Sequence, residues 1–516
     1  MTERDKRADG RGGEPVEGHD GERARGHSGS QAGEHNSSQA GGHDGSQARG
    51  HSGELVELTA TEMSALLRDR QVTAVELTEA HLRRIGEVNG RVNAIVTLVA
   101  DRALDEARSA DADLAAGRWR GPLHGLPVAH KDLADTAGIR TTYGSRLFAD
   151  HVPLEDDLLV RRIRQTGAIT LGKTNTPEFG TGSHTVNEVF GATRNPYAPS
   201  RSAGGSSGGA AAALASRMIP LADGSDMGGS LRNPASFCNV AGLRPTPGRV
   251  PSRSSTAAWF TLSAPGPMAR TVADLALFMS AIAGFDPASP YSIREDGSAF
   301  AGPLDRDVTG VRIAFSPDLG SLPVDAETAR VTAEGVGVFA SLGAKVEQVE
   351  LDLSDAEDAF RIYRAWFYAL TYGGVPGVGS NVAWNVEQGR KVTGDDLARA
   401  ERLRTRLFHR MSAFFGEYDF LVAPVSQVPP FPVEQPYVTE VAGRPMPDYL
   451  AWMRSCYWIS VLHAPAMSVP CGFTSDGLPV GLQIVGRPWA DLDVLRLGHA
   501  FEQATGHWRR RPEPPL

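Results

Sequence analysis

Cysteine is scarce in this chain, with three residues in 516. Cys238, Cys456 and Cys471 are too few and too far apart for a disulfide framework, and their spacing excludes a CxxC metal site. Free cysteine behaves as a small hydrophobic side chain and is often buried. We therefore expect three buried thiols without a metal or redox role.

The sequence also lacks an excess of basic residues and a long apolar run. It has 52 Lys and Arg against 61 Asp and Glu, a formal net charge of −9 at pH 7, so no broad positive field is available to hold a nucleic acid or an anionic membrane. No apolar run reaches the roughly 20 residues that a membrane span needs, and the N-terminus has no hydrophobic region typical of a secretion signal. We expect a cytoplasmic protein whose partner is a small molecule.

Residues 1–53 differ from the rest, because they contain almost no large apolar side chains and are rich in Gly, Ser, Gln, Glu and Arg. Such a composition cannot bury enough surface to offset the entropy of ordering, so we predict a disordered tail. Histidine recurs every eight residues in it, at His19, His27, His35, His43 and His51. This repeat is compatible with copper or nickel binding and equally with simple repeat expansion.

From Glu54 onward the pattern is that of a folded α/β domain extending to residue 516. Two capping boxes, which begin at Thr59 and Thr73, predict two helices. A third helix is expected at 101–115, and a short buried strand at 126–129 would deliver Lys131 at its carboxyl end. A strand at 311–315, a helix at 325–342 and a strand at 346–351 predict a βαβ unit. Aromatic side chains at helical spacing follow, at Phe360, Tyr363, Trp366 and Phe367, and they suit either core packing or a pocket wall.

The stretch with the clearest chemistry is 202–234. Two glycine-rich turns, GGSSGG at 204–209 and GSDMGGS at 224–230, bracket a small-residue helix at 210–215, and each turn presents a serine. Glycine lets the backbone approach another group closely, so bare N–H groups in such turns can point at a ligand. The second turn therefore predicts a nucleophile, Ser230, with an oxyanion hole beside it.

Several separated motifs resemble those of the amidase signature family of serine hydrolases, from about Leu55 to the end of the chain. They are the two turns and the segments GLPVAHKD at 125–132, GKTNTPEFG at 172–180, RNPY at 194–197, GPMARTVAD at 266–274, and SVPCGF with GLPVGLQIVGRP near the C-terminus. The resemblance implies a single large domain with a mixed central sheet flanked by helices. It also implies an amidase that needs no metal or cofactor.

The resemblance further implies a catalytic triad. Ser230 would be the nucleophile, Ser206 the relay preceded by a cis peptide bond, and Lys131 the base. Only a neutral lysine accepts a proton, so Lys131 should be buried with a lowered pKa, and the neighbouring Asp132 should point away or be bound by backbone donors. The backbone N–H groups of Met227, Gly228, Gly229 and Ser230 would stabilise the oxyanion. Ser207, Asp226 and Arg232 are further candidates for substrate binding or site organisation, and we favour a structural role for Arg232.

Two other motif matches are rejected on context. Residues 167–174, GAITLGKT, fit the P-loop formula, but the would-be loop is strand-like and Pro177 follows closely. Residues 204–208 fit the nucleophile elbow of α/β-hydrolases, but 194–203 is turn-like and no strand leads into Ser206.

The sequence leaves three functions open. A stand-alone amidase for a carboxamide, with an aryl or bulky acyl group as one option, is favoured. The alternative is a glutaminase similar to the A subunit of the tRNA-dependent amidotransferase, and a non-catalytic binding protein comes third. Asn233 and His463 stand where the glutaminase branch or the family usually has Gln and Gly, which argues against the alternative and puts the acyl pocket in question. The oligomeric state is also open, a homodimer included.

Overall fold

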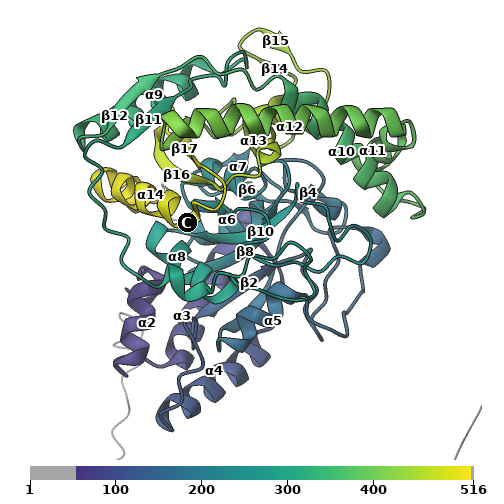
Figure 1. Cartoon of the computed structure of the whole chain (residues 1–516). Helices are drawn as coiled ribbons and strands as arrows, with labels where there is room; N and C mark the ends of the chain where they lie inside the picture. Colours follow the sequence, from purple (N-terminus) through teal and green to yellow (C-terminus); the bar gives the residue numbers. More distant parts are fainter. Residues whose placement is uncertain (1–53, 513–516) are drawn as a thin grey trace, which may run out of the picture. The chain divides into compact units, whose positions relative to one another are not determined.

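The computed structural model describes residues 54–512 of the chain (Figure 1). Residues 1–53 and 513–516 lie outside the described part. The predicted disorder of the tail and the histidine repeat therefore stay predictions, as does the domain boundary at residue 53.

The N-terminal helices begin where the sequence predicts. Thr59 caps α2 (Ala60–Arg68) and Thr73 caps α3 (Ala74–Val92), and both capping boxes are complete, with Glu62 and Glu76 bonded back to the cap N–H groups. Reciprocal caps of this kind satisfy N–H groups that a helix end otherwise leaves unpaired. The third helix, α4 (Ala100–Ala115), also matches its prediction.

An eleven-stranded mixed sheet forms the centre of the domain. Its strands, in spatial order, are β1 (Ile95–Leu98), β3 (Ile169–Thr174), β2 (Pro127–Lys131), β8 (Leu221–Asp226), β10 (Ala264–Ala269), β9 (Ala241–Arg244), β16 (Ala466–Phe473), β17 (Pro479–Gly486), β13 (Phe420–Pro424), β11 (Arg312–Phe315) and β12 (Lys345–Gln348). The strands β2, β3, β13 and β17 are buried along their whole length, as expected where helices cover both faces of a sheet. The mixed α/β architecture agrees with the sequence prediction.

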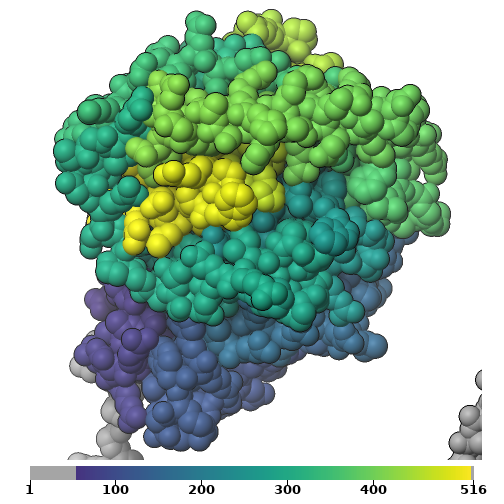
Figure 2. All heavy atoms as spheres, in the orientation of Figure 1, coloured from purple at the N-terminus to yellow at the C-terminus, as the bar shows by residue number. Residues whose placement is uncertain are grey.

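Helices cover this sheet (Figure 1). Besides α3 and α4, which contact β3, the helices of the described part include α5 (Leu158–Gln165), α6 (Gly208–Ala215), α7 (Arg232–Phe237), α8 (Val272–Ile282), α9 (Ala326–Ser341), α10 (Asp355–Tyr372), α11 (Ser380–Arg390), α12 (Gly394–Glu417), α13 (Arg454–Val461) and α14 (Asp491–Thr505). Of these, α11 and α12 pack mainly against α10. The helix α14 packs against α8 and β16, and in Figure 2 the C-terminal residues, in yellow, lie between teal and green segments of the chain. Among residues 54–512 we find no helix that is both long and apolar enough to cross a membrane.

Short elements lie outside the main sheet. They are the strand pairs β4 (Val186–Asn187) with β5 (Gly191–Ala192), β6 (Arg194–Asn195) with β7 (Ala198–Ser202), and β14 (Glu440–Val441) with β15 (Arg444–Pro445), and five 3-10 turns, η1 (Arg146–Phe148), η2 (Glu178–Gly180), η3 (Gly297–Phe300), η4 (Ala451–Met453) and η5 (His507–Arg509). The prediction that 194–203 is only turn-like is therefore wrong for 194–195 and 198–202, because β6 and β7 pair across a tight reversal.

The predicted βαβ unit is confirmed, since β11 and β12 pair in parallel around α9. The aromatic stripe of α10 serves both of its expected roles. Phe360 is fully buried and stacks on Tyr457 with ring centroids 4.2 Å apart. Phe367 remains half-buried and stacks on Phe260 at 4.4 Å, on the wall of a cavity.

Candidate active site

Lys131 is the last residue of β2 and is 1% exposed. Its Nζ donates to Ser206 Oγ at 2.7 Å and lies 3.4 Å from Ser225 Oγ. Burial lowers the pKa of Lys131 to about 7, although the carboxylates of Asp226 and Asp223 oppose this shift. A large fraction of Lys131 is therefore neutral near pH 7 and can accept a proton.

Ser206 lies between a glycine-rich turn and α6, and the Gly205–Ser206 bond is cis, as the resemblance implied. A Cβ on residue 205 would stand 2.9 Å from the backbone nitrogen of His184, so glycine is required there. The Gly205 N–H donates to Asn233 Oδ1 at 3.3 Å. Asn233 thus supports the backbone that leads into Ser206.

Ser230 ends the turn between β8 and α7, and it is buried with 6% exposure. Its carbonyl accepts from the Ser207 N–H at 3.3 Å. Within residues 54–512, no hydrogen bond joins the Ser206 and Ser230 hydroxyls. The Ser207 hydroxyl is buried without a partner in the same part of the chain and does not cap α6.

Both glycine-rich turns are shorter than the sequence indicates. Residues 224–226 complete strand β8, and Gly208 and Gly209 already belong to α6. The second turn therefore consists of 227–230, where Gly229 has a φ of +108° that favours glycine.

The amides of this turn divide into two sets. The Gly229 N–H donates to Asp226 Oδ1 at 2.9 Å, so this predicted oxyanion donor is already engaged. The N–H groups of Met227, Gly228 and Ser230 have no hydrogen-bond acceptor among the described residues. These three remain as candidate donors to an oxyanion.

Asp226 and Arg232 form a fully buried ion pair that fixes the turn. Arg232 donates to both carboxylate oxygens of Asp226 and also to Gln483 Oε1 at 2.6 Å and Ser460 Oγ at 2.8 Å. Burial alone would raise the pKa of Asp226, but the guanidinium groups of Arg232 and Arg244 hold it well below its usual range. All of these contacts join Arg232 to other groups of the protein, so its side chain holds the turn in place, which is the structural role favoured for it above.

Replacing Asp226 by asparagine is expected to lower the apparent free energy of unfolding by about 3–5 kcal/mol, because it leaves the buried Arg232 guanidinium uncompensated. Urea denaturation followed by circular dichroism measures this. The exposed pair of Arg330 and Glu334 supplies the control, since Glu334→Gln should leave the midpoint unchanged. An unchanged midpoint for Asp226→Asn would contradict the structural role of this pair.

The neighbours of Lys131 in sequence face elsewhere. His130 Nδ1 is 2.5 Å from Asp223 Oδ2, and Thr170 Oγ1 is 3.3 Å from its Nε2. Asp132 accepts from the backbone N–H and hydroxyl of Thr142, as expected for a carboxylate bound by backbone donors. Neither side chain contacts Ser206 or Ser230 in the described structure.

The P-loop match is excluded by the fold. Residues 169–174 form strand β3, and Lys173 is fully buried with its Nζ 2.8 Å from Thr136 Oγ1. Among residues 54–512 there is also no group of three or more His, Cys, Asp or Glu side chains arranged to hold a metal ion. The three cysteines are free and buried, as predicted.

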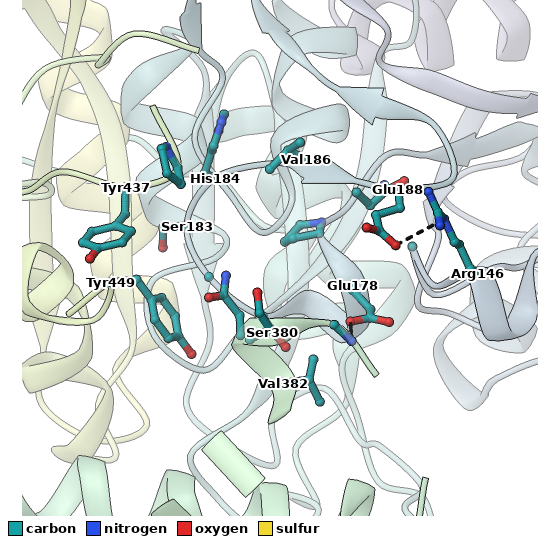
Figure 3. Close-up of a pocket in the computed structure, with 18 of the residues that line it drawn as sticks. Arg146, Glu178, Ser183, His184, Val186, Glu188, Ser380, Val382, Tyr437 and Tyr449 are labelled. Carbon is teal, nitrogen blue, oxygen red and sulfur yellow. Dashed lines mark hydrogen bonds and ion pairs between the residues drawn. The ribbon is translucent and has the colours of Figure 1, made fainter. Parts of the chain in front are cut away.

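Two cavities lie near these residues. One, of about 220 Å³, borders Lys131 and Ser225. The other, of about 330 Å³, is lined in part by residues 181–184. The backbone of Ser183 and His184 also packs against Gly205. Figure 3 shows this second cavity, with Tyr437 and Tyr449 on one side and the ion pair of Arg146 and Glu188 on the other.

Sequence reasoning missed a buried polar cluster beside the second cavity. Arg364 is 4% exposed and donates to the hydroxyls of Tyr368 and Tyr449, to Asn385 Oδ1 and to Met227 Sδ. Because α10, α11 and the loop before α13 supply these groups, no local spacing connects them. The only available signal was an arginine within the aromatic stripe of α10.

Comparisons with known proteins find matches over most of this chain. The family model described as Amidase matches residues 76–495. The chain is 38% identical over 491 residues to the A subunit of the glutamyl-tRNA(Gln) amidotransferase of Moorella thermoacetica, and the match covers 89% of this chain and 99% of the relative. It is 35% identical over 475 residues to an acylamidase of Rhodococcus erythropolis, with 89% and 98% covered.

Solved structures also superpose on most of this chain. A bacterial aryl acylamidase superposes with a TM-score of 0.82 at 29% identity and covers 89% of this chain and 99% of its own. The 6-aminohexanoate cyclic dimer hydrolase complexed with substrate gives 0.79 at 26% identity, with 89% and 100% covered.

Proposed function

Because the chain belongs to the amidase family and is an amide hydrolase, we propose that Ser230 is its nucleophile, Ser206 the proton relay and Lys131 the base. The observation that carries this assignment is the 2.7 Å contact between Lys131 Nζ and Ser206 Oγ in a buried environment. A lysine desolvated in this way is a base suited to neutral pH.

Acylation begins when Ser230 Oγ attacks the amide carbonyl carbon. The Ser230 proton passes to Ser206 Oγ as the Ser206 proton passes to neutral Lys131, and charge develops on the carbonyl oxygen. The N–H groups of Met227, Gly228 and Ser230 face this oxyanion, and in comparable enzymes one such donor contributes roughly 3 kcal/mol. The contact between the two serines forms with substrate bound, since catalytic hydrogen bonds are often incomplete in a free enzyme.

The C–N bond then breaks, and the same relay returns a proton from the Lys131 ammonium through Ser206 to the departing nitrogen. A seryl ester remains on Ser230. Water attacks it, giving one proton to the relay, and the carboxylic acid leaves as Ser230 regains its hydrogen. The products are a carboxylate and ammonia or an amine, with no metal or cofactor in any step.

A glutaminase is the second candidate function, favoured by the 38% identity to the A subunit of an amidotransferase. Asn233 and His463 still argue against it. A homodimer and a cytoplasmic location stay predictions.

The purified chain alone should hydrolyse simple aryl or aliphatic amides and leave glutamine intact. Release of ammonia or amine from a panel of both substrate types measures this. Hydrolysis of glutamine, above all if a partner protein stimulates it, with no turnover of the other amides would instead establish the glutaminase function.

A further inference from the structure

The pairing between β2 and β8 stops just before the proposed base. These two strands are neighbours in the sheet (Figure 1) and run parallel, but their last paired residues are Ala129 and Ala222. On its other side β2 stays paired with β3 as far as Lys131, and β8 stays paired with β10 as far as Asp226. Lys131 therefore lies at a strand end that has a main-chain partner on one side only.

A side chain continues the link where the strand pairing stops. The Lys131 N–H donates to Asp223 Oδ1 at 2.9 Å, and Oδ2 of the same carboxylate lies 2.5 Å from His130 Nδ1. Asp223 and His130 are both at most 1% exposed. One carboxylate on β8 thus holds two consecutive residues of β2, and burial shields both contacts from solvent.

The cavity of about 220 Å³ begins at the same place. Its lining includes Lys131, Asp223, Gly224 and Ser225, which all follow the last pair of β2 and β8. A strand end that borders a cavity has fewer packed neighbours and is held less tightly than one that is packed on both sides. The bond to Asp223 is the contact that ties the main chain of the base to β8 at this edge of the cavity.

The proposed reaction needs this part of the chain to be fixed. A general base must stay within hydrogen-bond reach of the proton that it accepts. The Nζ of Lys131 is held by the Ser206 hydroxyl at 2.7 Å, but a lysine side chain is long and flexible, so its aim depends on where its main chain lies. Asp223 and β3 hold that main chain from two sides.

Asp223 also acts on the base through its charge. A nearby carboxylate favours the ammonium form of a lysine, and the carboxylates of Asp226 and Asp223 hold the pKa of Lys131 higher than burial alone would. Asp226 is offset by two buried guanidinium groups. Among residues 54–512, Asp223 has no ion pair with a lysine or arginine, and its one ion-pair neighbour is His130.

The other titratable groups packed near this end of β2 are bonded elsewhere. They are Asp132, Lys173 and Asp157, whose partners are the Thr142 N–H, the Thr136 hydroxyl and the Leu159 N–H. The helix α6, which also packs on β2, carries no titratable side chain, and the charged neighbour of the buried His81 on α3 is Arg270. Asp223 is therefore the acid that both bonds to the main chain of Lys131 and acts on its charge.

We propose that Asp223 is a positioning residue for the base: its carboxylate holds the main chain of Lys131 across the gap between β2 and β8, and its negative charge sets the pH range over which the base is neutral. His130 in turn holds this carboxylate in place. The inference rests on the proposed triad and adds the group that aligns and tunes its base.

Asp223→Asn separates the charge from the geometry. Asparagine keeps an oxygen that accepts from the Lys131 N–H, and its amide can donate to the unprotonated nitrogen of a neutral His130, so both contacts survive. Loss of a carboxylate lowers the pKa of a neighbouring lysine, so the acidic limb of the acylation rate should move to lower pH by roughly half a unit or more. The burst with 4-nitrophenyl acetate, followed from pH 5 to 9, measures this limb.

Asp223→Ala removes the contacts as well as the charge. It should show the same shift and also lower the plateau rate above the limb by roughly 10-fold or more, because a displacement of about 1 Å can cost roughly 10²-fold in rate. If this variant folds poorly, Asp223→Asn still decides the role of the charge. His130→Gln keeps the charge of Asp223 and should leave the limb in place.

Asp157→Asn is the matched control. Asp157 lines the same cavity and caps α5, asparagine caps a helix equally well, and Asp157 is not among the acids that act on Lys131. Its limb should therefore stay where it is in the wild-type enzyme.

The outcomes separate this inference from the triad. An acidic limb that does not move to lower pH in Asp223→Asn, while Lys131→Met still abolishes it, would overturn the tuning role of Asp223. An equal shift in Asp157→Asn would do the same, since any charge lost at the cavity would then suffice. An unchanged plateau in Asp223→Ala would overturn the positioning role. A limb that survives in Lys131→Met would instead refute the proposed triad.

Discussion

Ser230→Ala is expected to abolish amide hydrolysis, with kcat reduced roughly 10⁵-fold or more, because the members of a nucleophile–base unit act together and residual rates come only from binding and the oxyanion hole. The fold should be unaffected, since the Ser230 hydroxyl is not joined to that of Ser206 in the described structure and its removal breaks no buried network. Steady-state release of product, together with the melting temperature, measures both parts.

Trapping the acyl-enzyme sharpens this result. With a slowly deacylated ester, mass spectrometry of the wild-type protein should show one added acyl group on the peptide that contains Ser230, and Ser230→Ala should show none. Ser206→Ala serves as the matched variant, because it removes the relay but keeps the nucleophile. An acyl group found on Ser206, or activity above a trace in clean Ser230→Ala, would refute the assignment.

The second large effect concerns Lys131. Since only neutral lysine accepts a proton, the acylation rate should rise with pH through an apparent pKa of about 7, the value to which burial lowers the pKa of Lys131, and level off above it. Below that pH the ammonium form dominates and the rate falls tenfold per pH unit. Lys131→Met should remove this ionisation and lower kcat/KM by about 10⁴-fold or more.

His130 provides the test of this interpretation, because it adjoins Lys131 in the chain and histidine is the side chain most often used as a general base. Its ring bonds to Asp223 and Thr170 and has no hydrogen bond to Ser206 or Ser230 in the described structure, so His130→Gln should retain the acidic limb of the pH profile even if it lowers stability. The pre-steady-state burst measured from pH 5 to 9 isolates acylation from deacylation. If His130→Gln were the variant that loses the limb, the base would be a histidine and the lysine assignment would be wrong.

Lys131 on β2 and Lys173 on β3 show that the acid adjacent to a lysine in the sequence need not be the acid that shifts its pKa. Asp132 adjoins Lys131 in the chain, but its carboxylate faces Thr142 and the field of Lys173. The acids that act on Lys131 are Asp223 and Asp226, both on β8. Asp132 lies one residue past the end of β2, whereas β8 pairs with β2 and brings its two acids close to Lys131, so strand pairing decides which charges meet.

The sequence by itself determined the features that depend on local spacing. The candidate triad of Lys131, Ser206 and Ser230 came from the resemblance of separated motifs to a family, whereas capping boxes predicted α2 and α3, and hydrophobic patterns predicted β2 and the unit of β11, α9 and β12. These features rest on residues a few positions apart or on glycine turns whose geometry is local.

Only the tertiary structure decided the rest. In the folded chain the Gly229 N–H donates to Asp226 and β7 pairs with β6. Arg364, Tyr449 and Asn385 come together in one buried cluster. The tertiary structure also placed Phe260 against Phe367 on the wall of the cavity that borders Lys131. The residues of this cluster and of the Phe260–Phe367 stack lie tens to hundreds of positions apart, and their contacts depend on strand order and helix packing, which no short stretch of sequence encodes.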